Sequence, residues 1–104
     1  MRVRRFGRSY AHPLIVLIAF QNQEATLRLG FSASRSIGNA VKRNRCKRLL
    51  RTGMRELLKR ISPGWDIILL ARAPIVNASF DEIREALHAL LGRAQLLINN
   101  GSKF

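Results

Sequence analysis

The segment from Arg35 to Arg60 constrains the fold of this chain more than any other. It holds ten of the nineteen basic residues and a single acid, Glu56. At 100° per residue its apolar side chains fall on one stripe, which predicts a helix from about Gly38 or Asn39 to Ile61. The stripe comprises Cys46, Leu50, Gly53, Leu57 and Ile61, with Met54 and Leu58 beside it. A helix with one apolar face must pack on another element, so this segment belongs to a folded domain.

The opposite stripe of the predicted helix is polar and basic, and it consists of Asn44, Arg48, Arg51, Arg55 and Lys59. One acid cannot neutralise it through i,i+4 ion pairs, and the whole chain carries a net charge of +13. Such a charge indicates a polyanionic partner, either RNA, DNA or an acidic membrane surface. The apolar stripe offers Leu, Ile, Met and Cys rather than the Trp or Phe of a membrane-surface helix, which favours packing on a sheet.

Three segments predict the strands of that sheet. Leu14–Phe20 and Trp65–Ala71 are continuous apolar runs typical of buried strands, and the second is expected to be central. From Ala25 to about Ser34, apolar residues alternate with small or basic ones, as in a half-exposed strand. The polar residues Gln21–Gln23 predict a hairpin between the first two strands.

A second helix is predicted at the end of the chain. Ser62–Gly64 should stop the basic helix, and Ser79 with Glu82 forms a capping-box pattern that predicts a helix from Phe80 to about Ile98. Its buried face should comprise Ile83, Ala86, Leu87, Leu90, Leu91 and Ala94. The order β-β-α-β-α in 104 residues, without linker or repeat, predicts one α+β domain over residues 1–104.

The acids do not assemble into a catalytic constellation. Three of the six lie in the first turns of the last helix, where the helix dipole favours them. The others are dispersed between a loop, the basic helix and a strand. Among them, Asp66 is expected to hydrogen-bond to the basic helix or to end its strand rather than to act as a general base.

The remaining reactive side chains are also expected to be structural. His12 and His88 lie on separate elements, so a shared metal is not expected. Cys46 is the only cysteine and lies on the apolar stripe, which predicts a small buried hydrophobe rather than a nucleophile, in a reducing compartment. No apolar run approaches the length of a membrane span.

Two stretches resemble the bacterial ribonuclease P protein family. GFSASR (Gly30–Arg35) followed by IGNAVKRNRCKRLLR (Ile37–Arg51) is similar to the signature of that family. The most specific part is an asparagine between two arginines, with Lys-Arg two residues further on. Asp66–Arg72 resembles the strand that follows in the family, and the similarity covers about residues 7–95.

The resemblance implies a fold and an activity. The family fold is a ribosomal-protein-like α/β sandwich with one mixed sheet, whose β-α-β crossover is left-handed, against the usual rule. The implied function is that of protein cofactor of ribonuclease P, the endoribonuclease that removes the 5′ leader of precursor tRNA. Catalysis would belong to the RNA subunit, with Mg²⁺ bound mainly by that RNA and the substrate. The implied partners are ribonuclease P RNA and precursor tRNA in the cytoplasm, with no membrane and no obligate protein partner.

The resemblance also assigns two sets of residues, neither of them catalytic or metal-binding. The set expected to dock on the catalytic RNA is Lys42, Arg43, Asn44, Arg45, Lys47, Arg48, Arg51 and Arg55. The set expected to hold the single-stranded leader is Phe20, Arg28, Ser32, Ser34 and Arg35. Gly30 should leave room for the leader, and Ile18 should lie with Phe20 on the neighbouring strand. The helix that precedes the first strand in the family is expected to be missing or truncated, because only six residues precede Gly7.

Two alternatives stay open at this point. One is a structural RNA-binding protein of ribosomal type, and promotion of leader cleavage would separate it from a ribonuclease P subunit. The other is a DNA-binding regulator, which a preference for structured RNA over duplex DNA would exclude. A helix-turn-helix reader is disfavoured because strands flank the basic helix on both sides.

Overall fold

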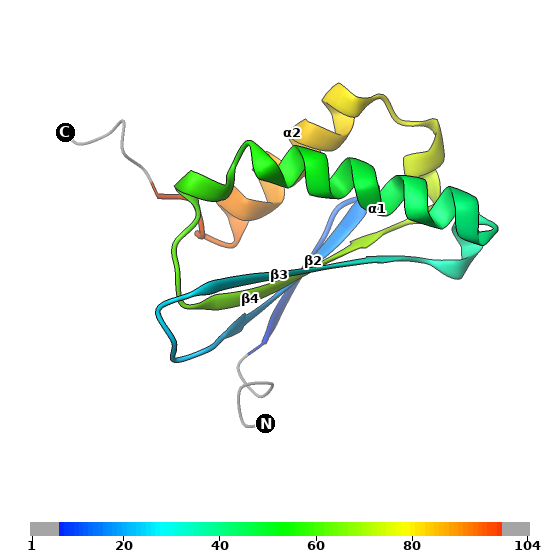
Figure 1. Cartoon of the computed structure of the whole chain (residues 1–104). Coiled ribbons are helices and arrows are strands. Elements are labelled where there is room, and N and C mark those ends of the chain that lie inside the picture. Colours follow the sequence, from blue (N-terminus) through cyan, green and yellow to red (C-terminus); the bar gives the residue numbers. More distant parts are fainter. Residues whose placement is uncertain (1–6, 99–104) are drawn as a thin grey trace.

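Two helices cover one face of a four-stranded mixed sheet in the computed structural model, which describes residues 7–98 (Figure 1). The elements in chain order are β1 (Arg8–Ala11), β2 (Ile15–Gln21), β3 (Leu27–Ala33), the 3-10 turn η2 (Arg35–Ile37), α1 (Ala40–Arg55), η3 (Leu58–Arg60), β4 (Trp65–Ala71), η4 (Ala73–Asn77) and α2 (Phe80–Arg93). The strand order is β1-β2-β4-β3, with β3 and β4 parallel and the other pairs antiparallel. No helix within the described residues is long and apolar enough to cross a membrane.

The core lies between the sheet and the two helices. Alternate side chains of β2 and β4 point into it, and Leu17, Ile67 and Leu69 are fully buried there. The helices contribute the stripes predicted from the sequence, since Leu50 of α1 and Leu87 of α2 are also fully buried. The predicted α+β class, with helices packed on a single sheet, is confirmed.

The connection between the two parallel strands is left-handed. In Figure 1 the chain runs along β3 at the edge of the sheet, returns through α1 above the sheet, and enters β4 behind β3. The expected crossover helix is therefore α1, and it places its basic outer surface directly above the β3 edge.

The predicted hairpin between β2 and β3 is wrong, because β4 lies between these two strands. The connection from Gln21 to Thr26 instead passes over the start of β4. The N–H of Asn22 donates to the carbonyl of Gly64 at 2.9 Å, and the N–H of Gly64 donates to the carbonyl of Thr26 at 2.7 Å. Insertion gives β4 a hydrogen-bonded strand on each side, so the prediction that it is central is confirmed.

Both helices end earlier than their periodicity predicts. α1 ends at Arg55 rather than at Ile61, and α2 ends at Arg93 rather than near Ile98. Gln95 adopts a φ of 59°, which turns the chain back so that Leu97 forms a β-bridge with Ile61. The 3-10 turn η3 replaces the last predicted turn of α1, and the bridge at Leu97 replaces that of α2.

The first strand was not predicted. β1 pairs with β2 through a tight turn in which the N–H of Leu14 donates to Nδ1 of His12 at 3.0 Å. The sequence gives little sign of β1, because its four residues are mostly exposed. The expectation that the family's first helix is missing or truncated concerns residues 1–6, which lie outside the described part of the chain.

Candidate nucleic-acid interface

The local sequence fixes where the basic helix begins. Ser34 ends β3 and its hydroxyl accepts from the N–H of Ser36 at 3.2 Å, which starts η2. Gly38 then turns the chain with a φ of 136°, a conformation that favours glycine. The Asn39 side chain accepts from the N–H of Lys42 at 3.0 Å and caps α1.

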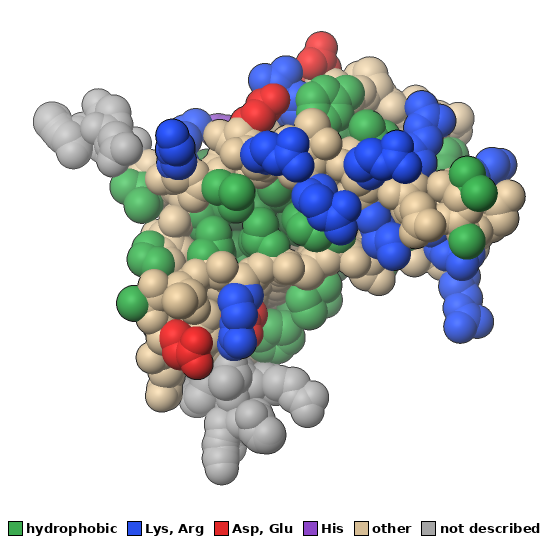
Figure 2. Space-filling view, in the orientation of Figure 1, with side chains coloured by type: hydrophobic (Ala, Val, Ile, Leu, Met, Phe, Trp, Pro, Cys, Tyr) green, Lys and Arg blue, Asp and Glu red, His purple; other side chains and the backbone are tan. Residues whose placement is uncertain are grey.

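The eight residues predicted to dock on RNA all lie on α1, and most of them are exposed. Figure 2 shows Lys and Arg side chains gathered along this helix. Within residues 7–98, none of these cations forms an ion pair with a carboxylate. Two of them contact the protein itself: Arg43 donates to the carbonyl of Gly38, and the Arg51 guanidinium lies 5.0 Å from the centroid of the Phe31 ring. The predicted docking residues are therefore gathered on α1, with Asn44, Arg48, Arg51 and Arg55 on its outer stripe.

The face of the sheet opposite the helices carries three of the five predicted leader-binding residues. Strand register arranges this open face in rows across β2, β4 and β3. The rows are Phe20–Asp66–Arg28, Ile18–Ile68–Gly30 and Val16–Leu70–Ser32. The open face is thus an apolar floor with polar groups along β3, which suits an unstacked nucleic-acid strand.

One expectation about this face needs correction. Ile18 and Phe20 do not lie on the strand next to β3, because β4 separates them from it. Ile68 and Leu70 of β4 therefore supply the middle of the floor, and the sequence analysis missed both. Because residues 67–71 of β4 are all apolar, the sequence does not show which of them face the open side.

A glycine allows Phe20 to lie at the end of the open face. A β-carbon on Gly7 would lie 2.5 Å from Cε1 of the Phe20 ring, so the ring packs directly over the backbone there. The remaining predicted leader residues, Ser34 and Arg35, lie beyond the end of β3. Ser34 lines a hollow of about 490 Å³ with Leu70 and Arg72.

Arg28 does not face solvent as a free cation. Its Nε and Nη2 each donate to one oxygen of the Asp66 carboxylate at 2.9 Å. Asn22 donates to the same carboxylate at 2.8 Å, and these contacts lower the pKa of Asp66, with the Arg28 hydrogen bond as the largest cause. Asp66 was expected to contact the basic helix or to end its strand, and it instead joins β3 to β4.

The Arg28–Asp66 pair makes acid stability a test of this geometry. A carboxylate whose pKa is lowered by folding stabilises the fold above its unfolded pKa of about 3.9 and loses that effect as pH falls through the folded value. Asp66→Asn should therefore be less stable than the parent chain at pH 7, and the difference should be smaller at pH 3, below the unfolded pKa. Urea unfolding at both pH values measures this difference. Arg28→Ala should remove most of the pH dependence, and an undiminished gap at pH 3 would contradict the assignment.

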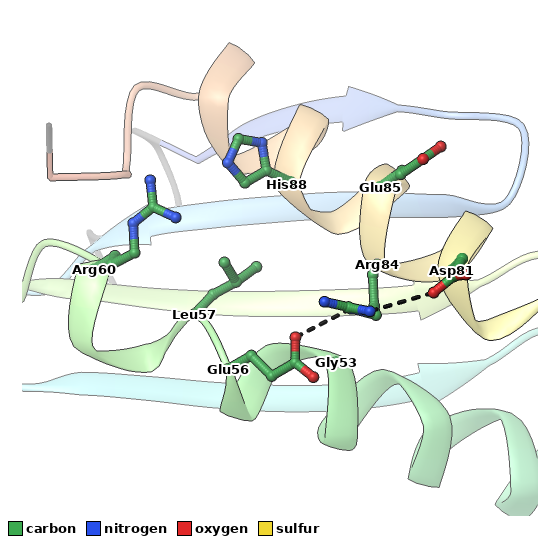
Figure 3. A pocket seen from close by; sticks show the side chains of 8 residues that line it. All are labelled: Gly53, Glu56, Leu57, Arg60, Asp81, Arg84, Glu85 and His88. Carbon is green, nitrogen blue, oxygen red and sulfur yellow. Dashed lines mark hydrogen bonds and ion pairs between the residues drawn. The ribbon is translucent and has the colours of Figure 1, made fainter. Parts of the chain in front are cut away.

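A hollow of about 470 Å³ between α1 and α2 is lined by charged side chains of both signs (Figure 3). In it Arg84 lies between two acids, with its Nε 3.1 Å from Oε1 of Glu56 and its Nη1 3.2 Å from Oδ1 of Asp81. Glu56, the single acid of the basic segment, thus pairs with α2 rather than with a cation of α1. Because Arg84 is already paired and three acids, Glu56, Asp81 and Glu85, line it, this hollow is a poor phosphate site.

Cys46 is buried against the core, with 5% of its surface exposed. Burial raises the pKa of its thiol, and the nearby charge of Arg45 offsets this only in part. The predicted role as a small buried hydrophobe is confirmed, since a raised pKa disfavours the nucleophilic thiolate.

Replacing the thiol should therefore affect stability more than function. Cys46→Ala should lower the free energy of unfolding by roughly 1 kcal/mol through the lost buried atom. It should still support RNA-dependent cleavage, because no chemistry depends on the thiol. Chemical unfolding and a cleavage assay measure the two effects, and a folded but inactive variant would give the thiol a chemical role.

The fold and this surface define a class: a small, basic α+β protein with an unneutralised cationic helix beside an open sheet face. Comparison with known proteins identifies the family. The family model described as Ribonuclease P matches residues 1–95. The chain therefore belongs to the ribonuclease P protein family, as its signature predicted.

Individual relatives agree with this assignment. The ribonuclease P protein component of Herpetosiphon aurantiacus is 41% identical over 95 residues, which cover 91% of this chain and 77% of the relative. That of Listeria innocua is 40% identical and covers 98% and 88%. The relative in Chloroflexus aurantiacus carries the same name, which disfavours the structural RNA-binding alternative.

Solved structures give the same result for the fold. The RNase P protein of Staphylococcus aureus superposes with a TM-score of 0.81 at 32% identity, covering 92% of this chain and 88% of that one. The protein from Thermotoga maritima gives a TM-score of 0.78 at 29% identity, covering 88% and 87%.

Proposed function

We propose that this chain is the protein cofactor of ribonuclease P in the cytoplasm and that it binds the catalytic RNA through the outer surface of α1. One observation carries the proposal: the described residues pair none of the Lys and Arg side chains of α1 with an acid. Unpaired cations on one rigid helix repel one another unless phosphates lie against them. The guanidinium groups of Arg45 and Arg48 can each bind a phosphate through two N–H groups, and the neighbouring Asn44 can contact a sugar or base.

The open face of the sheet is the proposed site for the 5′ leader of precursor tRNA. Its apolar floor of Ile18, Ile68 and Leu70 can receive unstacked bases, and Phe20 can stack on one of them. Arg28 lies at the edge of this floor, where it can exchange part of its contact with Asp66 for a phosphate. A leader held along this face would position the scissile phosphate relative to the docked RNA.

The described residues do not fit a magnesium site on the protein. Mg²⁺ prefers oxygen ligands such as carboxylates, and no group of three metal-ligating side chains occurs within residues 7–98. Asp66, Glu56 and Asp81 are each held by an arginine. We therefore assign Mg²⁺ and the cleavage chemistry to the RNA partner and its substrate, and to this chain the binding of phosphates and bases.

Cleavage of precursor tRNA by a bacterial ribonuclease P RNA at low Mg²⁺ tests the proposal. The chain should strongly stimulate cleavage of a substrate with a long leader and lose most of that effect when the leader is cut to one or two nucleotides. Stimulation that does not depend on leader length would mean that the open sheet face does not bind the leader. Tight RNA binding without stimulation of cleavage would favour the alternative of a structural RNA-binding protein.

A further inference from the structure

A further hollow lies between the N-terminal half of α1 and η4. These two elements are distant in sequence but lie side by side (Figure 1). The cavity has a volume of about 320 Å³. That is at the lower end of the range of about 300–1,000 Å³ typical of small-molecule sites. It is large enough for one flat ring system and too small for a folded element of a partner.

The inner wall of this cavity is apolar. Ile37, Cys46 and Ile75 are buried behind it, and Leu49 is half-buried beside them. Val76 forms part of the outer wall with 50% of its surface exposed. The wall is therefore apolar from the buried core out to the surface at Val76.

The rim of the cavity is cationic. Lys42 and Arg45 are both exposed there, and neither Asp nor Glu lines the cavity. Asn77 is also exposed at the rim, and its amide takes part in none of the side-chain hydrogen bonds among residues 7–98. The apolar walls suit the faces of a nucleobase, and the amide of Asn77 suits its polar edge. The two cations suit the phosphates on either side of it.

We infer that this cavity receives a single unpaired nucleobase of the ribonuclease P RNA, an inference that rests on the proposed docking of α1. Proteins recognise RNA sequence mostly by splaying out unpaired bases and reading their edges. Here the base enters between α1 and η4, Asn77 hydrogen-bonds to its edge, and Lys42 and Arg45 hold the phosphates on either side. The cavity then adds a base contact to the phosphate contacts of α1, which carry no sequence information themselves.

Filling the cavity tests the inference. Ala78 lines it and is half-buried, so Ala78→Leu places three additional carbons in the space for the base. Ala89→Leu adds the same atoms at an exposed position of α2 and serves as the control. Ala78→Leu should weaken binding to ribonuclease P RNA about ten-fold, the scale of one base contact, while Ala89→Leu should bind like the parent chain. Circular dichroism melts establish that both variants fold.

Single abasic substitutions in the RNA separate a base from other occupants. One unpaired nucleotide should weaken binding to the parent chain by a similar factor when its base is removed, and this loss should vanish in the Ala78→Leu background. Asn77→Ala, an exposed change, should show part of the same coupling if Ala78→Leu does not fold. The inference is overturned if Ala78→Leu binds normally, or if no single base removal couples to the cavity. Arg48→Ala is measured in parallel, because its failure to weaken binding would overturn the docking of α1 instead.

Discussion

Replacing Arg45 and Arg48 together by Ala should weaken binding to ribonuclease P RNA by about 3 kcal/mol, roughly a hundred-fold. Both side chains are exposed on α1 and pair with no acid among the described residues. Each lost phosphate contact should also lower the slope of log K against log salt by about 0.7 to 0.9. Titrations at several salt concentrations measure both the affinity and the slope.

A charge-matched control separates specific contacts from net charge. Arg8 and Arg60 are exposed cations that lie outside α1, so Arg8→Ala with Arg60→Ala removes the same two charges. This control should retain most of the affinity and of the salt slope. Equal losses in the two double variants would mean that the chain binds RNA through its overall charge. Neither variant should change the stability by more than about 0.5 kcal/mol, since all four side chains lie on the surface.

The docking helix could be predicted because its information is local. The apolar stripe through Cys46 and Leu50 follows from periodicity alone, and the Asn39 cap and the charge pattern depend on residues within a few turns. The signature around Asn44 then identified the family. Ser79 and Glu82 are equally local, and the predicted capping box is present, with hydrogen bonds of 2.8 and 3.1 Å.

The errors concern contacts between segments that are far apart in the chain. The order of the strands depends on where β4 inserts, and nothing near Gln21–Gln23 encodes that choice. Beyond the early ends of α1 and α2, Ile61 pairs with Leu97. The periodicity of either helix alone does not predict this pairing. The same limit explains why Ile68 and Leu70 were missed at the open face, because their direction follows from the register of β4 with β2.

The contact that sets the distance between α1 and α2 gives the second large prediction. Gly53 lies on the apolar stripe of α1 and packs closely against α2: a β-carbon on Gly53 would lie 2.7 Å from Cδ1 of the fully buried Leu87. Gly53→Ala gains about 1 kcal/mol of helix propensity but forces this overlap, which costs about 1–3 kcal/mol. The net result should be a loss of about 1 kcal/mol. Leu87→Ala alone should cost about 3 kcal/mol through the cavity that it leaves.

The double variant should reverse the sign of the glycine substitution. With Leu87→Ala the obstructing methyl group is gone, so Gly53→Ala should stabilise that background by about 1 kcal/mol, a coupling of about 2 kcal/mol between the two sites. Urea unfolding of the four proteins measures the cycle. Gly92→Ala is the control, since a β-carbon there meets nothing within 4 Å and should act alike in both backgrounds. If Gly53→Ala had the same effect with and without Leu87, this contact would not determine how closely α1 packs against α2. Other core contacts would then have to determine the distance between the RNA-docking surface and the sheet.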